Sequence, residues 1–220
     1  MAYIIPVLYN DGMDMVLDRC KHALRAVVRQ FARGLNRVTR GHIHPNTVTL
    51  IGLAMHIPIA LAIAANMRIT AALLLVIFGL FDTLDGELAR LQHRASTAGM
   101  LLDSTTDRMK EVILYMGVAT NFIIAEQPWF CVWAVAAVGG SLLVSYVNAW
   151  GEVVLAQKPA SKHAVNQTFR GGLMRFEVRM VFLIIGLLSN QLAITVVIIA
   201  VLVWITAFQR LVGIYRRVQA

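Results

Sequence analysis

Long apolar stretches recur along this chain and limit what it can fold into more than any other feature. A helix that crosses about 30 Å of hydrocarbon needs roughly 20 mostly apolar residues. Of the 220 residues, 58% are hydrophobic, whereas ordinary soluble domains have roughly 45–50%. We therefore predict an all-α membrane protein with six transmembrane helices, at residues 48–65, 69–91, 100–124, 130–156, 178–188 and 192–212.

A basic pattern precedes the first predicted span. Arg25, Arg29, Arg33 and Arg37 recur every four residues, and apolar residues occupy another side of the same predicted helix. We predict an amphipathic helix that lies on the membrane surface, with its arginines toward anionic lipid head groups. An ordinary solvated basic face is the alternative. The predicted domains are an N-terminal segment, residues 1–45, and a six-span domain, residues 46–220.

The basic residues also indicate the orientation in the membrane, because Lys and Arg concentrate in short cytoplasmic segments. Of the 20 Lys and Arg residues, only Arg68 falls in a loop on the opposite side. We predict a multi-pass protein of the cell membrane with both termini and the active site on the cytoplasmic side. This topology accounts for the net charge of +8, and no basic motif with interleaved aromatic residues indicates nucleic-acid binding.

Four aspartates stand at the predicted cytoplasmic ends of consecutive spans. Asp82 and Asp85 are three residues apart and Asp103 and Asp107 are four apart, so each pair shares one helix face. The short turn between the two spans makes the helices antiparallel neighbours. Converging carboxylates repel one another unless cations neutralise them, and an all-oxygen ligand set suits Mg²⁺ or Mn²⁺. We predict two divalent ions of the kind that catalyse displacement at phosphorus.

Ordinary ion pairs with Arg90, Arg94 or Arg108 are the alternative explanation of these aspartates. Such pairs do not explain the small residues Gly86 and Ala89, which leave room for a ligand or for close helix contact. A cation transporter is an alternative of another class, although the acidic cluster has no counterpart in the second half of the chain.

The segment from Asp82 to Asp107 resembles the signature of the CDP-alcohol phosphotransferase family. It has every specified residue at the signature's spacing, namely Asp82, Asp85, Gly86, Ala89, Arg90, Gly99, Asp103 and Asp107. The resemblance implies that Asp82, Asp85 and Asp103 hold one Mg²⁺, and that Asp82, Asp103 and Asp107 hold a second. Asp107 would also be the general base. The resemblance further implies a homodimer and a set of residues that bind the CDP-alcohol: Asn46, Thr49, Gly86, Ala89, Arg90, Ser96 and Gly99.

The implied reaction moves a phosphate-linked group from a CDP-alcohol, with CDP-diacylglycerol as the first choice, to a polar alcohol, and releases CMP. A phosphorylated acceptor such as inositol phosphate or glycerol 3-phosphate is favoured by the basic residues Lys162, Arg170 and Arg179, of which Arg179 matches a family arginine that faces the acceptor. Asn148 and Trp150 stand where relatives that use inositol phosphate carry basic residues. The stretch from Met174 to Met180 is also similar to synthases of the di-inositol-phosphate type, so such an enzyme with a soluble donor remains an alternative.

Overall fold

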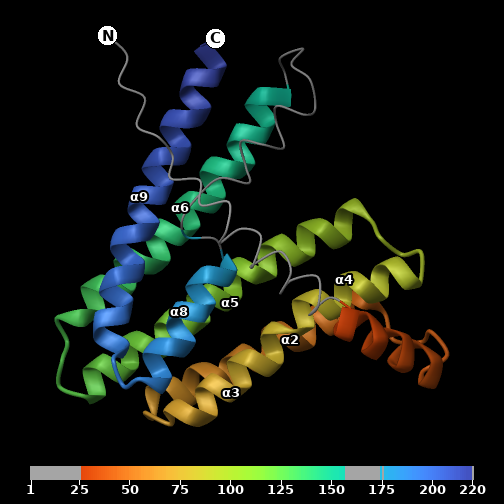
Figure 1. Ribbon diagram of the computed structural model, residues 1–220, viewed down its shortest axis with the longest axis horizontal. Helices are drawn as coiled ribbons and strands as arrows, with labels where there is room; N and C mark the ends of the chain where they lie inside the picture. Colours follow the sequence, from red (N-terminus) through yellow and green to blue (C-terminus); the bar gives the residue numbers. More distant parts are fainter. Residues whose placement is uncertain (1–25, 157–173, 175, 220) are drawn as a thin grey trace. The chain divides into compact units, whose positions relative to one another are not determined.

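The computed structural model of the chain describes residues 26–156, 174 and 176–219, apart from the side chains of Asp82 and Ala156. Within these ranges the regular structure is helical throughout, which confirms the predicted fold class (Figure 1). A first helix covers residues 26–38. The helices that follow are α2 (Pro45–Ala64), α3 (Arg68–Gly79), α4 (Phe81–Leu91), α5 (Thr97–Ile124), α6 (Phe130–Ala156), α8 (Phe176–Leu188) and α9 (Leu192–Gln219).

In the described part of the chain, four helical stretches are long and apolar enough to cross a membrane. α5 has 28 residues but carries several charged side chains, and α8 has only 13 residues, about 20 Å of helix. The prediction of membrane-spanning helices is confirmed, whereas the count of six crossings stays a prediction. The four stretches are Pro45–Ala64, Arg68–Leu91, Phe130–Leu155 and Leu192–Gln219.

The second predicted span is interrupted at Leu80. α3 ends at Gly79 and α4 begins at Phe81, and the Leu80 carbonyl accepts the N–H groups of Thr83 at 3.2 Å and Leu84 at 3.0 Å. A glycine weakens a helix interior by about 1 kcal/mol relative to alanine, which favours an interruption at this point. The span predicted at residues 69–91 corresponds to the stretch Arg68–Leu91, and the acidic motif lies in the first two turns of α4 within it.

The chain forms two compact units, which we describe separately. The first unit comprises the described residues up to Ile51 together with Gly79–Asp103, and the second comprises Gly52–Phe78 and the described residues from Ser104 onward. α2 and α5 each contribute residues to both units. The predicted domain boundary between residues 45 and 46 stays a prediction.

The core of the first unit joins the 26–38 helix to α4. Val28 and Ala32 are one turn apart and pack with Leu84 and Leu88 of α4 and with Val48 of α2. Another side of the 26–38 helix carries apolar residues that remain exposed: Val27, Phe31 and Val38. The apolar side predicted for this helix is therefore divided between a protein-facing part and an uncovered part.

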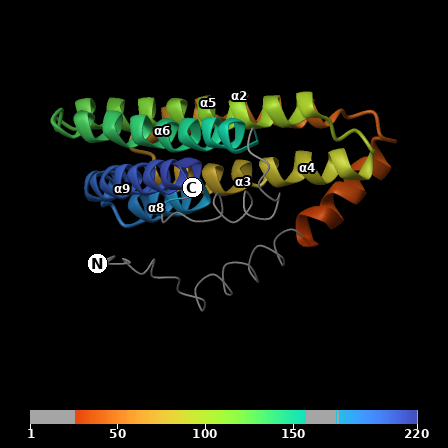
Figure 2. The same ribbon diagram turned by 90° about the horizontal axis from the view of Figure 1, so that it is seen from above.

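In the second unit, α6 and α9 run side by side, and α8 lies against α9 (Figures 1 and 2). The second-unit portion of α2 is packed tightly against α5. A Cβ added to Gly117 of α5 would lie 2.7 Å from the Cα of Ala60 in α2, so only glycine fits there. One turn further along α5, Asn121 Nδ2 donates a hydrogen bond to the Ile63 carbonyl at 2.9 Å.

Candidate active site

α4 and α2 bring two predicted site residues into direct contact in the first unit. Asp85 is buried, and its Oδ2 accepts a hydrogen bond from Thr49 Oγ1 at 2.5 Å. Thr49 lies one turn into α2, and its hydroxyl also lies 3.3 Å from the Pro45 carbonyl. The hydroxyl fixes one carboxylate oxygen of Asp85. Sequence reasoning assigned Asp85 to the metal and Thr49 to the nucleotide, and it did not anticipate this contact.

Three residues predicted to bind the donor gather where α5 begins. Ser96 precedes the helix, and its Oγ accepts the backbone N–H of Gly99 at 3.1 Å, which is an N-cap hydrogen bond. A Cβ added to Gly99 would lie 3.3 Å from Ser96 Oγ and 3.8 Å from Asn46 Oδ1. Asn46, Ser96 and Gly99 are therefore neighbours, although the sequence separates Asn46 from the other two by about 50 residues.

Arg90 has a partner that the sequence reasoning missed. Its Nη2 donates to Glu87 Oε1 at 2.8 Å, and Arg29 Nε donates to Glu87 Oε2 at 3.1 Å. The Glu87 side chain is only 4% exposed, whereas those of Arg29 and Arg90 are 52% and 61% exposed. A Cβ added to Gly86 would lie 3.6 Å from Arg90 Nη2, so the guanidinium extends over Gly86. The spacing of Glu87 and Arg90 could have predicted this ion pair, because residues three apart on a helix are neighbours.

The remaining residues of the motif divide between the two units. Asp103 is the last residue of the first unit, which also contains Ala89 and the backbone of Asp82, whereas Asp107 belongs to the second unit. Among the side chains that the structure describes, which leave out that of Asp82, no three His, Cys, Asp or Glu residues form a group that could hold a metal ion. The convergence of the four aspartates on a metal therefore stays a prediction.

Two cations flank Asp107 in the second unit. Lys110 Nζ donates to Asp107 Oδ1 at 3.2 Å, and Arg108 Nη2 lies 3.8 Å from Asp107 Oδ2. Lys110 is fully buried, and Arg108 also contacts Ser145 Oγ of α6. The carboxylate of the predicted general base is thus held from two sides by residues of its own helix.

A buried polar network extends from this point through three helices. Glu111 of α5 is fully buried and accepts hydrogen bonds from Arg179 Nε of α8 at 2.8 Å and from Ser141 Oγ of α6 at 2.6 Å. Arg179 Nη1 also donates to the carbonyl of Met174 at 2.6 Å. Sequence reasoning missed Glu111 and Ser141, although a glutamate within a predicted membrane span is itself a signal of function.

Arg179, which was predicted to face the acceptor, is buried within this network. Lys162 and Arg170, the other two predicted acceptor residues, lie outside the described residues. The cluster formed by Asp107, Arg108, Lys110, Glu111 and Arg179 has three cationic and two anionic side chains. Its single excess positive charge is in part shielded from water, and such a region attracts anions.

Comparison with known proteins assigns the chain to a family. A model of CDP-alcohol phosphatidyltransferase matches residues 42–211, which include the acidic motif and both ends of the buried network. The chain belongs to the CDP-alcohol phosphatidyltransferase family. It is therefore a transferase of phospholipid biosynthesis and an integral membrane protein. The cation-transporter alternative is set aside.

Curated relatives in archaea and bacteria cover much of the chain. The archaetidylinositol phosphate synthase of Pyrococcus horikoshii is 28% identical over 80% of this chain and 86% of its own length. That of Aeropyrum pernix is 34% identical over 77% of this chain and 82% of its own length. The phosphatidylinositol phosphate synthase of Corynebacterium glutamicum is 31% identical over 66% of this chain and 63% of its own length.

Solved structures share the fold. The phosphatidylinositol phosphate synthase of Mycobacterium tuberculosis, crystallised with CDP-DAG bound, has a TM-score of 0.72 and 24% identity, and the match covers 86% of this chain and 94% of that one. A second crystal structure of that enzyme, in complex with manganese and citrate, has a TM-score of 0.71 at 24% identity and covers 86% of this chain and 88% of that one.

Proposed function

We propose that this transferase moves a phosphatidyl-type group from a CDP-linked lipid to inositol phosphate and releases CMP. The observation that carries the choice of acceptor is that relatives named as archaetidylinositol phosphate synthase and phosphatidylinositol phosphate synthase match between 66% and 80% of the chain. The excess positive charge of the cluster around Glu111 and Arg179 supports the same choice, because a phosphorylated acceptor is an anion.

The donor side is assigned to the first unit. Asn46, Thr49, Gly86, Ala89, Arg90, Ser96 and Gly99 are proposed to bind the CDP group. The neighbouring positions of Asn46, Ser96 and Gly99 support this assignment, as does the guanidinium of Arg90 over Gly86, since arginine binds phosphate oxygens through paired N–H groups. CDP-diacylglycerol and an ether-linked CDP-archaeol are both compatible with the relatives' names.

Asp82, Asp85, Asp103 and Asp107 are proposed to hold a divalent metal, for which Mg²⁺ is the first choice and Mn²⁺ the second. The donor set fits such an ion, because all four residues offer carboxylate oxygens and the Asp85 carboxylate is buried with one oxygen already fixed by Thr49. When bound, the metal would supply positive charge next to the diphosphate of the donor. The neighbour crystallised with manganese supports this class of ion.

The proposed reaction is a direct displacement. The acceptor hydroxyl oxygen forms a bond to the lipid-linked phosphorus, the bond from that phosphorus to the bridging oxygen breaks, and CMP leaves with the electron pair. Asp107 takes the hydroxyl proton as general base and later gives it to solvent. Lys110 and Arg108 hold the Asp107 carboxylate in place for this step. We also propose that both termini and the site lie on the cytoplasmic side, which the distribution of basic residues supports. A homodimer is proposed from the family resemblance alone.

In the test of this proposal, purified protein is incubated with Mg²⁺, CDP-diacylglycerol and one of four acceptors. The acceptors are inositol phosphate, glycerol 3-phosphate, free inositol and serine. CMP release should be fastest with inositol phosphate and should stop when a chelator removes the metal. Parallel assays with CDP-archaeol and with soluble CDP-inositol test the donor, because the Rubrobacter xylanophilus relative, 30% identical over 54% of this chain, is named as a bifunctional IPC transferase and DIPP synthase. Faster turnover of serine or free inositol would refute the proposed acceptor.

Two substitutions separate the proposed roles. Asp107→Asn should abolish CMP release, because the base is lost, while CDP-diacylglycerol binding remains measurable. Ala89→Leu should weaken donor binding, because the larger side chain enters space proposed for the nucleotide. Glu152→Gln is the matched control, since Glu152 is an exposed acid on α6 and its loss should leave both quantities unchanged. Normal turnover in Asp107→Asn would remove Asp107 from the mechanism.

A further inference from the structure

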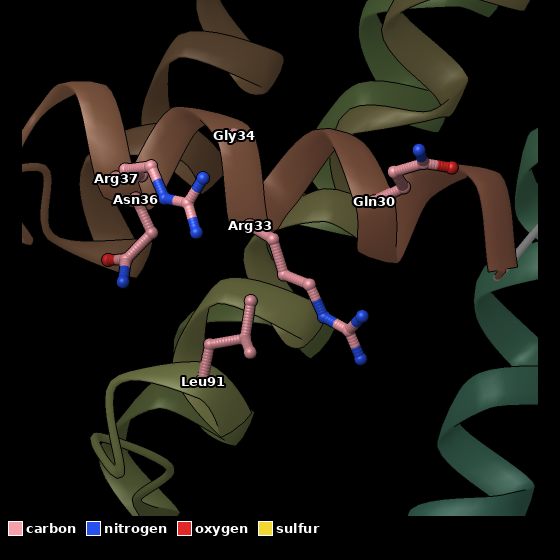
Figure 3. Close-up of a pocket in the computed structure, with 6 residues that line it drawn as sticks. All are labelled: Gln30, Arg33, Gly34, Asn36, Arg37 and Leu91. Atoms are coloured by element: carbon pink, nitrogen blue, oxygen red, sulfur yellow. The ribbon is translucent and has the colours of Figure 1, made fainter.

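The first unit has a pocket that the proposed reaction does not use. It has a volume of about 520 Å³ and is lined by Gln30, Arg33, Gly34, Asn36 and Arg37 of the 26–38 helix and by Leu91, the last residue of α4 (Figure 3). None of these six residues belongs to the sets assigned above to the metal, the donor or the acceptor.

Most of the pocket wall is apolar surface, and its hydrogen-bond donors come from the side chains of Gln30, Arg33, Asn36 and Arg37. Arg33 and Arg37 are one turn apart on the same helix side and are both exposed, and within the described part of the chain neither forms an ion pair. This distinguishes them from Arg29 on the same helix, which is bound to Glu87. Among the residues that the structure describes, none that lines the pocket is acidic. The two guanidinium groups extend in different directions in Figure 3, and each can by itself donate paired N–H groups to phosphate oxygens.

A neighbouring glutamine fixes the Asn36 amide. Gln92 Nε2 donates to Asn36 Oδ1 at 2.8 Å and lies 3.0 Å from the carbonyl of Ile43. The Asn36 oxygen is therefore occupied, and the amide N–H groups are what Asn36 has left to offer a ligand. The pocket thus has several donors at its wall, and one of them, the Asn36 amide, is already oriented.

The same helix has an exposed apolar side, which indicates the kind of molecule that carries the phosphate. Val27, Phe31 and Val38 share one side of the helix and are 67%, 63% and 83% exposed. In a membrane protein, an uncovered apolar side next to unpaired arginines is typical of a helix at the lipid interface, with its apolar residues among acyl chains and its arginines among head groups. A phospholipid can contact both sides of this helix, because its phosphate can bind the arginines and its acyl chains can cover the apolar residues.

We propose that this pocket binds the phosphate of an anionic phospholipid head group through Arg33, Arg37 and Asn36. The bound lipid is a structural ligand of the first unit, separate from the donor lipid of the reaction. Its acyl chains would cover Val27, Phe31 and Val38. The site thereby ties the 26–38 helix to the membrane surface through one specific head group rather than through general charge alone.

The test measures retention of short-chain lipids on the purified full-length protein in neutral detergent by native mass spectrometry. Dioctanoyl phosphatidylglycerol should bind, and dioctanoyl phosphatidylcholine should bind at least about tenfold more weakly, because its choline group cancels the negative charge. Arg33→Gln with Arg37→Gln should weaken phosphatidylglycerol binding about thirtyfold, since each arginine near a lipid surface contributes about 1 kcal/mol. Arg33→Lys with Arg37→Lys should lose less, because the charge remains while the paired donors do not.

A matched double variant controls for charge. Arg94→Gln with Arg216→Gln removes two positive charges from exposed arginines outside the pocket and should leave binding unchanged. Equal binding of the two lipids, or equal loss in the control variant, would overturn the proposal. Displacement of the lipid by inorganic phosphate alone would show a free-anion site, and displacement by CMP would assign the pocket to the donor; either result overturns the lipid assignment.

Discussion

Glu87 in the first unit and Glu111 in the second are both held by arginine, but their surroundings differ. The two arginines on Glu87 have side chains that are 52% and 61% exposed, whereas Arg179, the partner of Glu111, is 2% exposed. If Glu87 is lost, its arginines can turn to water. If Glu111 is lost, the buried guanidinium of Arg179 loses its counter-charge and cannot reach water. The same pair of residue types should therefore contribute very differently to stability.

The largest effect is expected for Glu111→Ala. Removal of one member of a buried ion pair costs about 3–5 kcal/mol, because the remaining charge stays buried without compensation. The free energy of unfolding, measured by denaturant titration in micelles, should fall by that amount. Glu111→Gln should cost less, because the amide oxygen can still accept a hydrogen bond. A smaller loss for Glu111→Ala than for Glu87→Ala would contradict the comparison.

Ser141→Ala should come next. The Ser141 hydroxyl donates to the Glu111 carboxylate at 2.6 Å, and a hydrogen bond to a charged group contributes about 1.5–3 kcal/mol. A double-mutant cycle with Glu111→Gln should give a clear coupling energy, because the two side chains share one contact. Additive losses would show that Ser141 acts independently of Glu111.

A smaller loss of stability is expected for Glu87→Ala, about 1 kcal/mol, because both arginines are solvated once released. Its functional effect should be larger. Arg90 is proposed to bind the CDP group, and without Glu87 its guanidinium is no longer fixed, so the KM for the donor should rise while kcat changes little. An unchanged donor KM would show that Arg90 needs no anchor.

Arg29→Gln should have the smallest effect, below about 1 kcal/mol, because Arg90 still holds Glu87 and Arg29 is half exposed. The difference from wild type should shrink further at high salt, where exposed charges are screened. A loss as large as that of Ser141→Ala would show that the 26–38 helix depends on this ion pair more than its exposure indicates.

Patterns along the sequence predicted the features of the fold that depend only on residues close together in the chain. The apolar runs predicted the positions of α2, α6 and α9. The Glu111 network was not predictable in this way, because its members come from α5, α6 and α8 and Arg179 is 68 residues from Glu111. Spacing along one helix cannot report such a partner.

The interruption at Leu80 was missed for another reason. A single Gly79 within an apolar run is common in membrane helices, so the run alone predicted a continuous span. Similarly, the apolar side of the 26–38 helix gave no sign that Val28 and Ala32 would pack on α4 while Val27 and Phe31 stay exposed. Each outcome depends on which neighbour is available to cover an apolar surface.

The contact between α2 and α5 has a consequence for how the chain enters the membrane. Asn121 is a polar side chain in an apolar segment, and its hydrogen-bond acceptor is the carbonyl of Ile63. Ile63 precedes Asn121 in the chain, so its carbonyl is synthesised before the side chain that donates to it. Gly117 then allows the later helix to settle against the earlier one at Ala60. The order of synthesis thus matches the order in which the polar group needs its partner.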